Sequence, residues 1–283
     1  MGITSASNGQ AAPRAVVIRT AGINCDREMA RGFSAAGADV SLVHLEKVCA
    51  QPAMLDGFDL IGFPGGFSYG DDVASGRIFA MKVRRALLPA LRAALDRKCP
   101  MLGICNGFQV LVQCGLLPGF ESDDSVGVER GAGLTDNACG HFVDSWVRVT
   151  YQPNTHCVWT QGLDSLGDDA RLLPVAHGEG RFVAHDRKVL DAIESANLGV
   201  IRYEDNFNGS DGAIAGLCDP SGLVLGLMPH PDRFLEWTRH PYWTRLPQSL
   251  LATEAPGLAS FRNAVRYAAE HAVRDNGVAQ QAC

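Results

Sequence analysis

The feature that most constrains this chain is a cysteine flanked by two glycines, placed between an apolar run and a helical segment. Met101–Ile104 is short and apolar, as in a buried strand, and Phe108–Cys114 is compatible with a helix. Gly103 and Gly107 flank Cys105 with the spacing of a nucleophile elbow, which holds a reactive residue on a sharp strand-to-helix turn. Small neighbours are needed because the turn is strained and the chain passes close to itself. The motif predicts an α/β fold with Cys105 at the carboxyl end of a strand.

Two interpretations of Cys105 remain open at this level. A cysteine at the positive end of a helix is expected to have a lowered thiol pKa and a larger thiolate fraction. Free cysteine is also among the most buried residue types and commonly serves as a small apolar side chain. Other parts of the chain have to decide between a nucleophile and a core residue.

Strand and helix signals alternate over the N-terminal third of the chain. Short apolar or β-branched runs predict strands at 15–18, 40–45, 59–63 and 101–104. Asn24 is expected to cap a helix that Gly37 closes, and Pro89 is expected to kink or restart a helix over 76–94. This order predicts a doubly wound, mostly parallel sheet, which binds ligands at the carboxyl ends of its strands.

The pattern changes after residue 122. Short strands are predicted at 146–150, 156–160, 181–184 and 200–203, which suggests additional antiparallel strands laid on the core sheet. The chain is expected to return to the parallel sheet at 213–218 and 223–228, and to end in an amphipathic helix through Leu258, Phe261, Val265 and Ala268. We therefore predict one domain over 14–274, with an extension at 234–256 and tails at 1–13 and 275–283.

Composition excludes several classes of function. The net charge of −6 gives no reason to expect nucleic acid or an anionic membrane as the main partner. No apolar run approaches the ~18 residues of a membrane span, and Met1–Pro13 lacks the pattern of a signal peptide. The nine cysteines include no Cys-x-x-Cys pair and no zinc-finger spacing to histidine. We expect free thiols in a reducing cytoplasm and no metal site.

A candidate base for Cys105 follows the last predicted strand. His230 stands between two prolines and Asp232 lies two residues further on, within reach of the imidazole in a turn. By itself this is commonly only a surface turn. Together with an elbow cysteine it makes a coherent Cys–His–Asp triad.

A glycine pair follows the third predicted strand, in the loop Pro64–Asp72. Gly65 and Gly66 can simply make a turn, but they can also bring backbone N–H groups close to a substrate oxygen. Together with the N–H of Asn106, the residue after the cysteine, such a group completes an oxyanion hole. Three loops at strand ends thus supply a nucleophile, a base and oxyanion donors.

These motifs match a known family. Gly103-Ile104-Cys105-Asn106-Gly107-Phe108-Gln109 together with His230-Pro231-Asp232 resembles the class I, triad-type glutamine amidotransferases. The loop at 64–72 and the segments at 18–26, 176–182 and 206–210 are similar to those of the glutaminase subunits of phosphoribosylformylglycinamidine synthase, the PurQ type. The resemblance runs from about Arg14 to Arg233.

The resemblance implies a flavodoxin-like fold and a glutaminase reaction. Cys105 would attack the glutamine carboxamide. The oxyanion and the substrate would be held by Gly65, Gly66 and Asn106. His230, oriented by Asp232, would transfer protons. Gln109 would help to hold glutamine, or would only pack on its helix. Ammonia would pass to a PurL-type synthetase subunit in purine biosynthesis, and a possible third partner is a small PurS-type subunit. The chain has no Gly-x-x-x-x-Gly-Lys-Ser/Thr loop, so ATP and Mg²⁺ are expected on the synthetase and no cofactor on this chain.

Two departures and two rival functions remain. The family pattern usually has Glu at the position of Asp232. The Trp- and Pro-rich segment 234–256 is an addition to the short form of the subunit, and we expect it either to form a docking surface or to cover the sheet edge. Glu179 and Arg181 are expected to contact substrate or partner, or to form a salt-bridged surface turn. The rivals are another class I amidotransferase or cysteine hydrolase of similar fold, and a catalytically weak regulatory subunit of the synthase.

Overall fold

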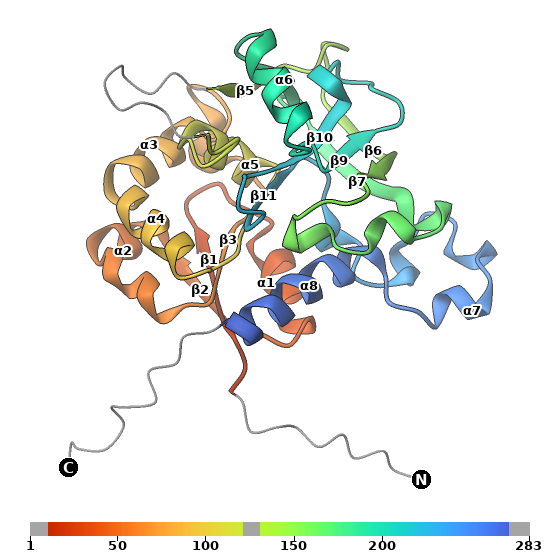
Figure 1. Ribbon diagram of the computed structural model, residues 1–283, viewed down its shortest axis with the longest axis horizontal. Helices are drawn as coiled ribbons and strands as arrows, with labels where there is room; N and C mark the ends of the chain where they lie inside the picture. Colours follow the sequence, from red (N-terminus) through yellow and green to blue (C-terminus); the bar gives the residue numbers. More distant parts are fainter. Residues whose placement is uncertain (1–10, 121–130, 272–283) are drawn as a thin grey trace.

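One large mixed sheet organises the protein (Figure 1). The computed structural model describes residues 11–120 and 131–271. Within them the large sheet has the order β2-β1-β3-β4-β11-β10-β9-β6-β7, and β5 pairs separately with β8. The strands are β1 (Arg14–Arg19), β2 (Asp39–His44), β3 (Leu60–Phe63), β4 (Met101–Ile104), β5 (Ala132–Thr135), β6 (Val143–Tyr151), β7 (Leu172–His177), β8 (Arg181–Ala184), β9 (Ile201–Tyr203), β10 (Ile214–Cys218) and β11 (Val224–Leu227).

Parallel and antiparallel pairing divide this sheet into two parts. From β2 to β11 neighbouring strands are parallel, and from β11 to β7 they are antiparallel. The predicted α/β fold with a parallel core and additional antiparallel strands is thus confirmed. The antiparallel strands extend the sheet edge to edge instead of lying on it, and β10 is antiparallel to β11, contrary to the prediction that both rejoin the parallel part.

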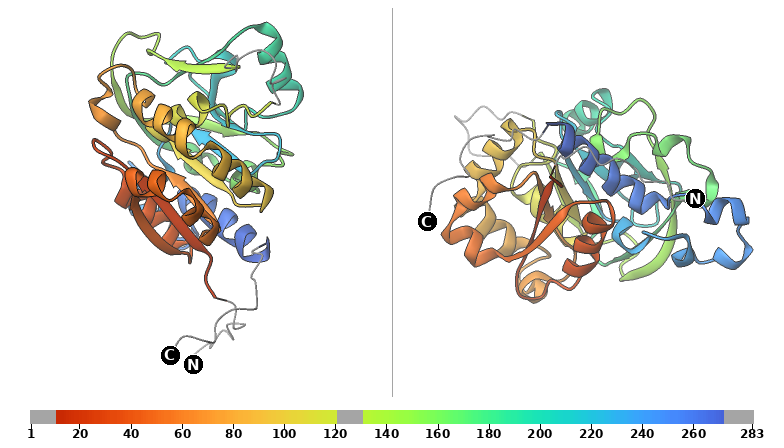
Figure 2. Two further views of the ribbon diagram at one scale, coloured as in Figure 1. Left: turned by 90° about the vertical axis from the view of Figure 1, so that its left-hand side faces the viewer. Right: turned by 90° about the horizontal axis from the view of Figure 1, so that it is seen from below.

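Helices cover both faces of the parallel part (Figures 1 and 2). The helices are α1 (Asp26–Ala35), α2 (Leu45–Ala50), α3 (Arg77–Ala86), α4 (Leu88–Asp96), α5 (Asn106–Gln113), α6 (Arg187–Ser195), α7 (Gln248–Leu251) and α8 (Pro256–His271). α1 packs against α8, and α3 packs against both α2 and α5. The chain moves from β1 to its neighbour β2 through α1, and then back past β1 to β3 through α2. Because these two crossovers run in opposite directions along the sheet and both are right-handed, they place α1 with α8 on one face and α2 with α3 and α5 on the other.

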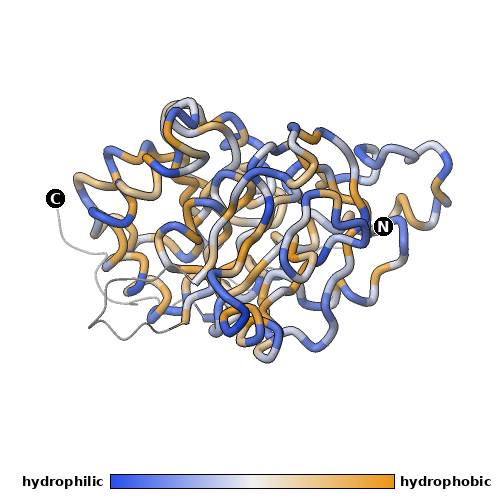
Figure 3. Tube along the Cα trace, turned by 90° about the horizontal axis from the view of Figure 1, so that it is seen from above, coloured by the Kyte–Doolittle hydropathy of each residue, from blue (hydrophilic) through white to orange (hydrophobic). Residues whose placement is uncertain are grey.

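The central strands form the core. Every residue of β3, β4 and β11 is buried, as expected for parallel strands covered on both faces. Figure 3 shows apolar segments gathered in the interior of the molecule, with hydrophilic segments toward its periphery. Among the described residues no helix is both long enough and apolar enough to cross a membrane.

Gly32 lets α1 approach α8, which gives a testable prediction. A Cβ at Gly32 would lie 2.6 Å from the end of the Phe261 ring, which is fully buried. Overpacking costs about 1–3 kcal/mol, whereas alanine improves helix propensity by up to about 1 kcal/mol. We expect Gly32→Ala to lower the free energy of unfolding by about 1–2 kcal/mol in urea denaturation. Ser34→Ala, on the exposed face of the same helix, should be neutral or slightly stabilising; equal effects of the two would contradict this packing.

The other local predictions had mixed outcomes. The helix restarts at Pro89 as predicted, since α3 ends at Ala86 and α4 begins at Leu88. Asn24 does not cap α1: Cys25 occupies the N-cap position, and no side chain caps that end. The strand predicted at 156–160 is wrong, because Val158–Thr160 is a single 3₁₀ turn. Residues 1–10 of the N-terminal tail predicted at 1–13, and the C-terminal tail predicted at 275–283, lie outside the described residues.

The extension at 234–256 packs on the antiparallel end of the sheet. Its Phe234, Trp237 and His240 are buried, and the Phe234 ring meets Trp146 of β6 edge-on with centroids 5.4 Å apart. The segment therefore acts as an ordered cover for this part of the sheet. Only its tip presents large aromatic surface, at Tyr242 and Trp243.

Candidate active site

Cys105 occupies a strained turn between β4 and α5. Its φ is +52°, a region that non-glycine residues rarely adopt. A Cβ at Gly107 would lie 1.8 Å from the carbonyl oxygen of Phe63, and one at Gly103 would lie 2.6 Å from that of Gly107. The two glycines are needed because the backbones of β3, β4 and α5 touch here, as the elbow motif predicts.

Strand pairing places His230 beside this turn. The N–H of Cys105 donates to the carbonyl of Leu227, the last residue of β11, at 2.8 Å. His230 follows three residues later, and a Cβ at Gly65 would meet both His230 Cε1 (2.8 Å) and Cys105 Cβ (3.4 Å). Cysteine, histidine and the Gly65 backbone therefore enclose one small space at the carboxyl ends of β3, β4 and β11.

The His230–Asp232 pair is buried and long. His230 Nδ1 lies 3.3 Å from Asp232 Oδ1, and both side chains are essentially inaccessible to solvent. No well-formed hydrogen bond joins them, and neither carboxylate oxygen of Asp232 has another partner among the described residues. Aspartate is one methylene shorter than the glutamate that the resemblance leads us to expect at this position, which is consistent with a carboxylate that approaches the imidazole without reaching ideal geometry.

Two backbone N–H groups are available near Cys105. Asn106 is the first residue of α5, so its N–H has no acceptor within the helix, and it faces the thiol of Cys105. Gly66, with φ of +142°, forms an isolated bridge with Ile23, and its N–H donates no hydrogen bond within the described part of the chain. A side chain at Gly66 would collide with the backbone of Ile23 and Asn24. Both predicted N–H donors are therefore available to bind an oxyanion.

The Cys105 thiol is more buried than the sequence suggests. Only 8% of the residue is exposed, and Sγ approaches the carbonyl oxygen of Ala176 at 3.9 Å. Burial, and secondarily the neighbouring Cys25, raise the pKa of Cys105 to about 12, against the lowering effect of the Asn106 N–H. The prediction of a lowered pKa at the helix end is therefore wrong for this conformation, because desolvation outweighs the helix end.

Gln109 belongs to a network that joins three loops. Its Nε2 donates to the carbonyl of Glu179 at 2.7 Å, and its Oε1 accepts from Asn106 Nδ2 at 3.1 Å. The carboxylate of Glu179 in turn accepts from the N–H of Ser75 at 3.2 Å. These contacts occupy the Gln109 amide, which favours a role in holding Asn106 and the Glu179 loop in place. Glu179 and Arg181 form no ion pair within the described residues, so the expected salt-bridged turn is absent there.

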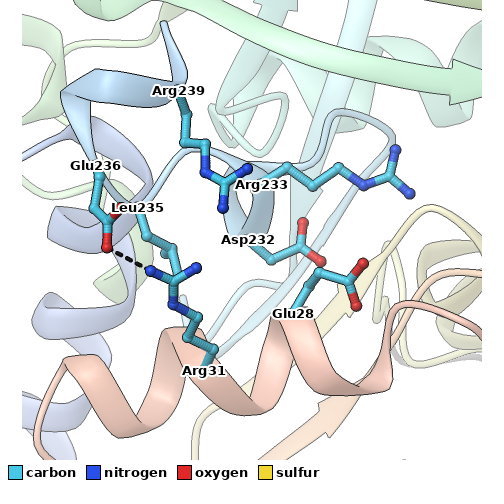
Figure 4. A pocket seen from close by; sticks show the side chains of 7 residues that line it. All are labelled: Glu28, Arg31, Asp232, Arg233, Leu235, Glu236 and Arg239. Atoms are coloured by element: carbon cyan, nitrogen blue, oxygen red, sulfur yellow. Dashed lines mark hydrogen bonds and ion pairs between the residues drawn. The ribbon is translucent and has the colours of Figure 1, made fainter.

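Some residues around the site were not singled out by the sequence. Arg233 Nη2 contacts Cys25 Sγ at 3.1 Å, next to Asp232. A charged cavity of about 330 Å³ lies behind them, and Figure 4 shows its lining of Glu28, Arg31, Asp232, Arg233, Leu235, Glu236 and Arg239. Tyr203 of β9 is also buried, and burial, with a smaller effect of Cys105, raises the pKa of its hydroxyl. Cys25 lies in the opening motif, but no motif marks Tyr203.

No group of three or more His, Cys, Asp or Glu side chains within 11–120 and 131–271 has the arrangement of a metal site. The polar groups at the carboxyl ends of β3, β4 and β11 are instead a thiol, an imidazole–carboxylate pair and backbone N–H donors. This set suits acyl transfer through a covalent cysteine adduct.

Comparison with known proteins identifies the family. Residues 12–268 match the CobB/CobQ-like glutamine amidotransferase domain. The chain is 38% identical to phosphoribosylformylglycinamidine synthase subunit PurQ of Dehalococcoides mccartyi, over 90% of this chain and 97% of that protein. The chain belongs to the PurQ-type glutamine amidotransferases. The PurQ subunit of Mycobacterium tuberculosis is 42% identical over 75% of this chain and 83% of its own length.

A solved structure agrees with this assignment. A chain in the structure of PurLQS from Thermotoga maritima is 31% identical and superposes with a TM-score of 0.67, over 91% of this chain and 99% of that one. A glutamine amidotransferase from Methylobacillus flagellatus, at 13% identity and a TM-score of 0.51 over 96% of this chain and 99% of that one, shares the fold alone. The amidotransferase resemblance and the fold expected from it are thereby confirmed.

Proposed function

We propose that this chain is the glutaminase subunit of phosphoribosylformylglycinamidine synthase and that Cys105, His230 and Asp232 carry its reaction. The observation that carries the proposal is the pairing of β4 with β11, which sets a strained cysteine beside a buried histidine at adjacent strand ends. Two available backbone N–H groups, from Gly66 and Asn106, complete the set. The extent of the match to PurQ proteins supports the assignment of the synthase.

The reaction proceeds in two halves. His230 takes the Cys105 proton, Sγ attacks the carboxamide carbon of glutamine, and the oxyanion is held by the N–H groups of Gly66 and Asn106. His230 then returns the proton to the amide nitrogen, the C–N bond breaks, and ammonia leaves a glutamyl thioester. In the second half His230 takes a proton from water, hydroxide attacks the thioester carbon, and Sγ leaves with that proton. The products are glutamate and ammonia, and Asp232 keeps the imidazole oriented.

The ammonia is used elsewhere in the complex. The chain has no Gly-x-x-x-x-Gly-Lys-Ser/Thr loop, so ATP and Mg²⁺ belong to a PurL-type synthetase subunit. The PurLQS structure of the T. maritima relative supports PurL- and PurS-type partners for this chain too. A cytoplasmic location fits its described cysteines, all of which are free thiols.

The decisive experiment measures glutamate formed from glutamine by the purified chain, with and without PurL- and PurS-type subunits. We expect the complex to form the synthase product from glutamine. Without this chain, the partner subunits should form that product only from added ammonia. A complex that cannot use glutamine, despite full activity with ammonia, would give this chain a purely regulatory role in the synthase and reject the proposal.

We also expect the isolated chain to be a poor glutaminase. Cys105 is 8% exposed, and burial raises the pKa of its thiol. We therefore expect docking of the synthetase to reorganise the loop Gly65–Asp72, so that its oxyanion-donating N–H points at the substrate. The glycines at 65 and 66 let this loop reorganise at low cost, and a misdirected oxyanion donor costs ~10²–10³ in rate. Addition of the synthetase with its nucleotide should raise kcat by about that factor. An isolated chain that already hydrolyses glutamine at the rate of the complex would show that the site is preformed.

A further inference from the structure

A buried histidine outside the triad has a ring nitrogen without a partner. His177, the last residue of β7, is 3% exposed, and its Nε2 has no hydrogen-bond partner among the described residues. It lies beside the reactive centre, because the carbonyl of the preceding Ala176 is 3.9 Å from Cys105 Sγ. A buried polar atom without a partner is costly, so a ligand is the natural complement of this one.

The neighbours of His177 fix which ring nitrogen carries the proton. Asn137 Nδ2 points at two carbonyl oxygens, those of His177 (2.8 Å) and His141 (3.2 Å), so its Oδ1 is the acceptor. That oxygen lies 3.0 Å from His177 Nδ1 and also accepts from the N–H of Gly180. Nδ1 therefore donates, and in the neutral ring Nε2 is an unprotonated acceptor.

The ring stays neutral under ordinary conditions. Burial, and secondarily the nearby His230, lower the pKa of His177 to about 4. The ring is also fixed in place, since a Cβ at Gly180 would lie 2.2 Å from Nδ1. The buried Tyr203 hydroxyl likewise has no partner among the described residues, and burial, and secondarily Cys105, raise its pKa. Phe207 packs against both rings, with centroids 5.7 Å from His177 and 5.1 Å from Tyr203.

We propose that His177 Nε2 accepts a hydrogen bond from the carboxamide nitrogen of bound glutamine and from the ammonia that leaves it. This rests on the proposed function. The carboxamide oxygen belongs to the N–H donors of Gly66 and Asn106, so the NH₂ group is the part of the reacting amide that offers a donor to Nε2. A neutral, buried acceptor suits a neutral amide or NH₃ and disfavours the charged α-ammonium of glutamine, which would have to be desolvated.

Neutrality also serves the transfer of ammonia. Ammonia must reach the synthetase as NH₃, because the ammonium ion has no lone pair with which to attack. An imidazolium at this position would protonate it, whereas a neutral His177 can hold it only as an acceptor. His177 is thus assigned to binding the leaving group, a role distinct from the proton transfer by His230.

An ester substrate isolates this contact. Glutamate γ-methyl ester has the same acyl group as glutamine, but its leaving group has no N–H. We would measure kcat/KM for both substrates with the reconstituted complex, because this parameter reports on the steps up to departure of the first product. His177→Phe should lower kcat/KM for glutamine about tenfold more than for the ester, the usual size of one lost hydrogen bond.

Two further variants control the result. His177→Gln keeps an acceptor oxygen and should recover part of the preference for the amide, and His141→Phe, an exposed histidine of the neighbouring loop, should change neither substrate. An equal loss with both substrates in His177→Phe and His177→Gln would overturn the inference, since a disturbed site slows any acyl transfer. A parent complex that hydrolyses neither substrate would instead reject the proposed function.

Discussion

Cys105→Ala should abolish product formation from glutamine while leaving product formation from added ammonia nearly intact. The thiol is the only group at the elbow placed to form the thioester, so its removal should lower the glutaminase rate on the order of 10⁴-fold or more. Ammonia-dependent synthesis uses the partner's site and needs only that this chain be folded and docked. The two rates measured on one reconstituted complex therefore separate loss of chemistry from loss of assembly.

Covalent labelling provides an independent measurement. A chloroketone analogue of glutamine should modify Cys105 and none of the other eight cysteines, as read by peptide mass spectrometry. Cys139→Ala removes an exposed thiol elsewhere and should leave both the rate and the labelling unchanged. Hydrolysis of glutamine by Cys105→Ala at the parent rate would show that another group is the nucleophile.

The parts of the site that are local in the sequence were the parts that could be predicted. The elbow at Cys105 and the turn at His230 each depend on a few consecutive residues, and their meeting follows from the rule that parallel strands end at one edge of a sheet. His177 and Tyr203 come from β7 and β9, which belong to the antiparallel part, and only the completed fold brings them to Cys105. No short sequence motif indicates that these two residues lie near Cys105.

Two wrong predictions have physical explanations. The pKa of Cys105 depends on how deeply the thiol is buried, and the helix end alone does not report that. The orientation of β10 was available from the sequence: the turn Asp219–Gly222 is too short for a crossover, so the two strands it joins have to be antiparallel. The length of this turn therefore determined the strand direction, and the prediction did not use it.

His230→Ala is expected to lower the glutaminase rate by several orders of magnitude, because its imidazole takes and returns the proton. His177, the other buried histidine near Cys105, has a pKa lowered to about 4 by burial and is a poor replacement as a base. Asp232→Asn should cost less, since packing keeps much of the imidazole orientation: both side chains are almost fully buried. If Asp232 acts through His230, the double variant should be little slower than His230→Ala alone, as members of one catalytic unit are not additive. Fully additive losses would contradict that coupling.

Asp232→Glu tests the length of the same contact. The 3.3 Å separation between His230 Nδ1 and Asp232 Oδ1 leaves room for a stronger hydrogen bond if the carboxylate moves closer. We expect kcat for glutamine hydrolysis by the complex to be retained or raised up to about tenfold, the effect of one better-formed hydrogen bond. A large loss of kcat with an unchanged melting temperature would mean that the turn at His230 is built for the shorter side chain and that the present distance is already the working one.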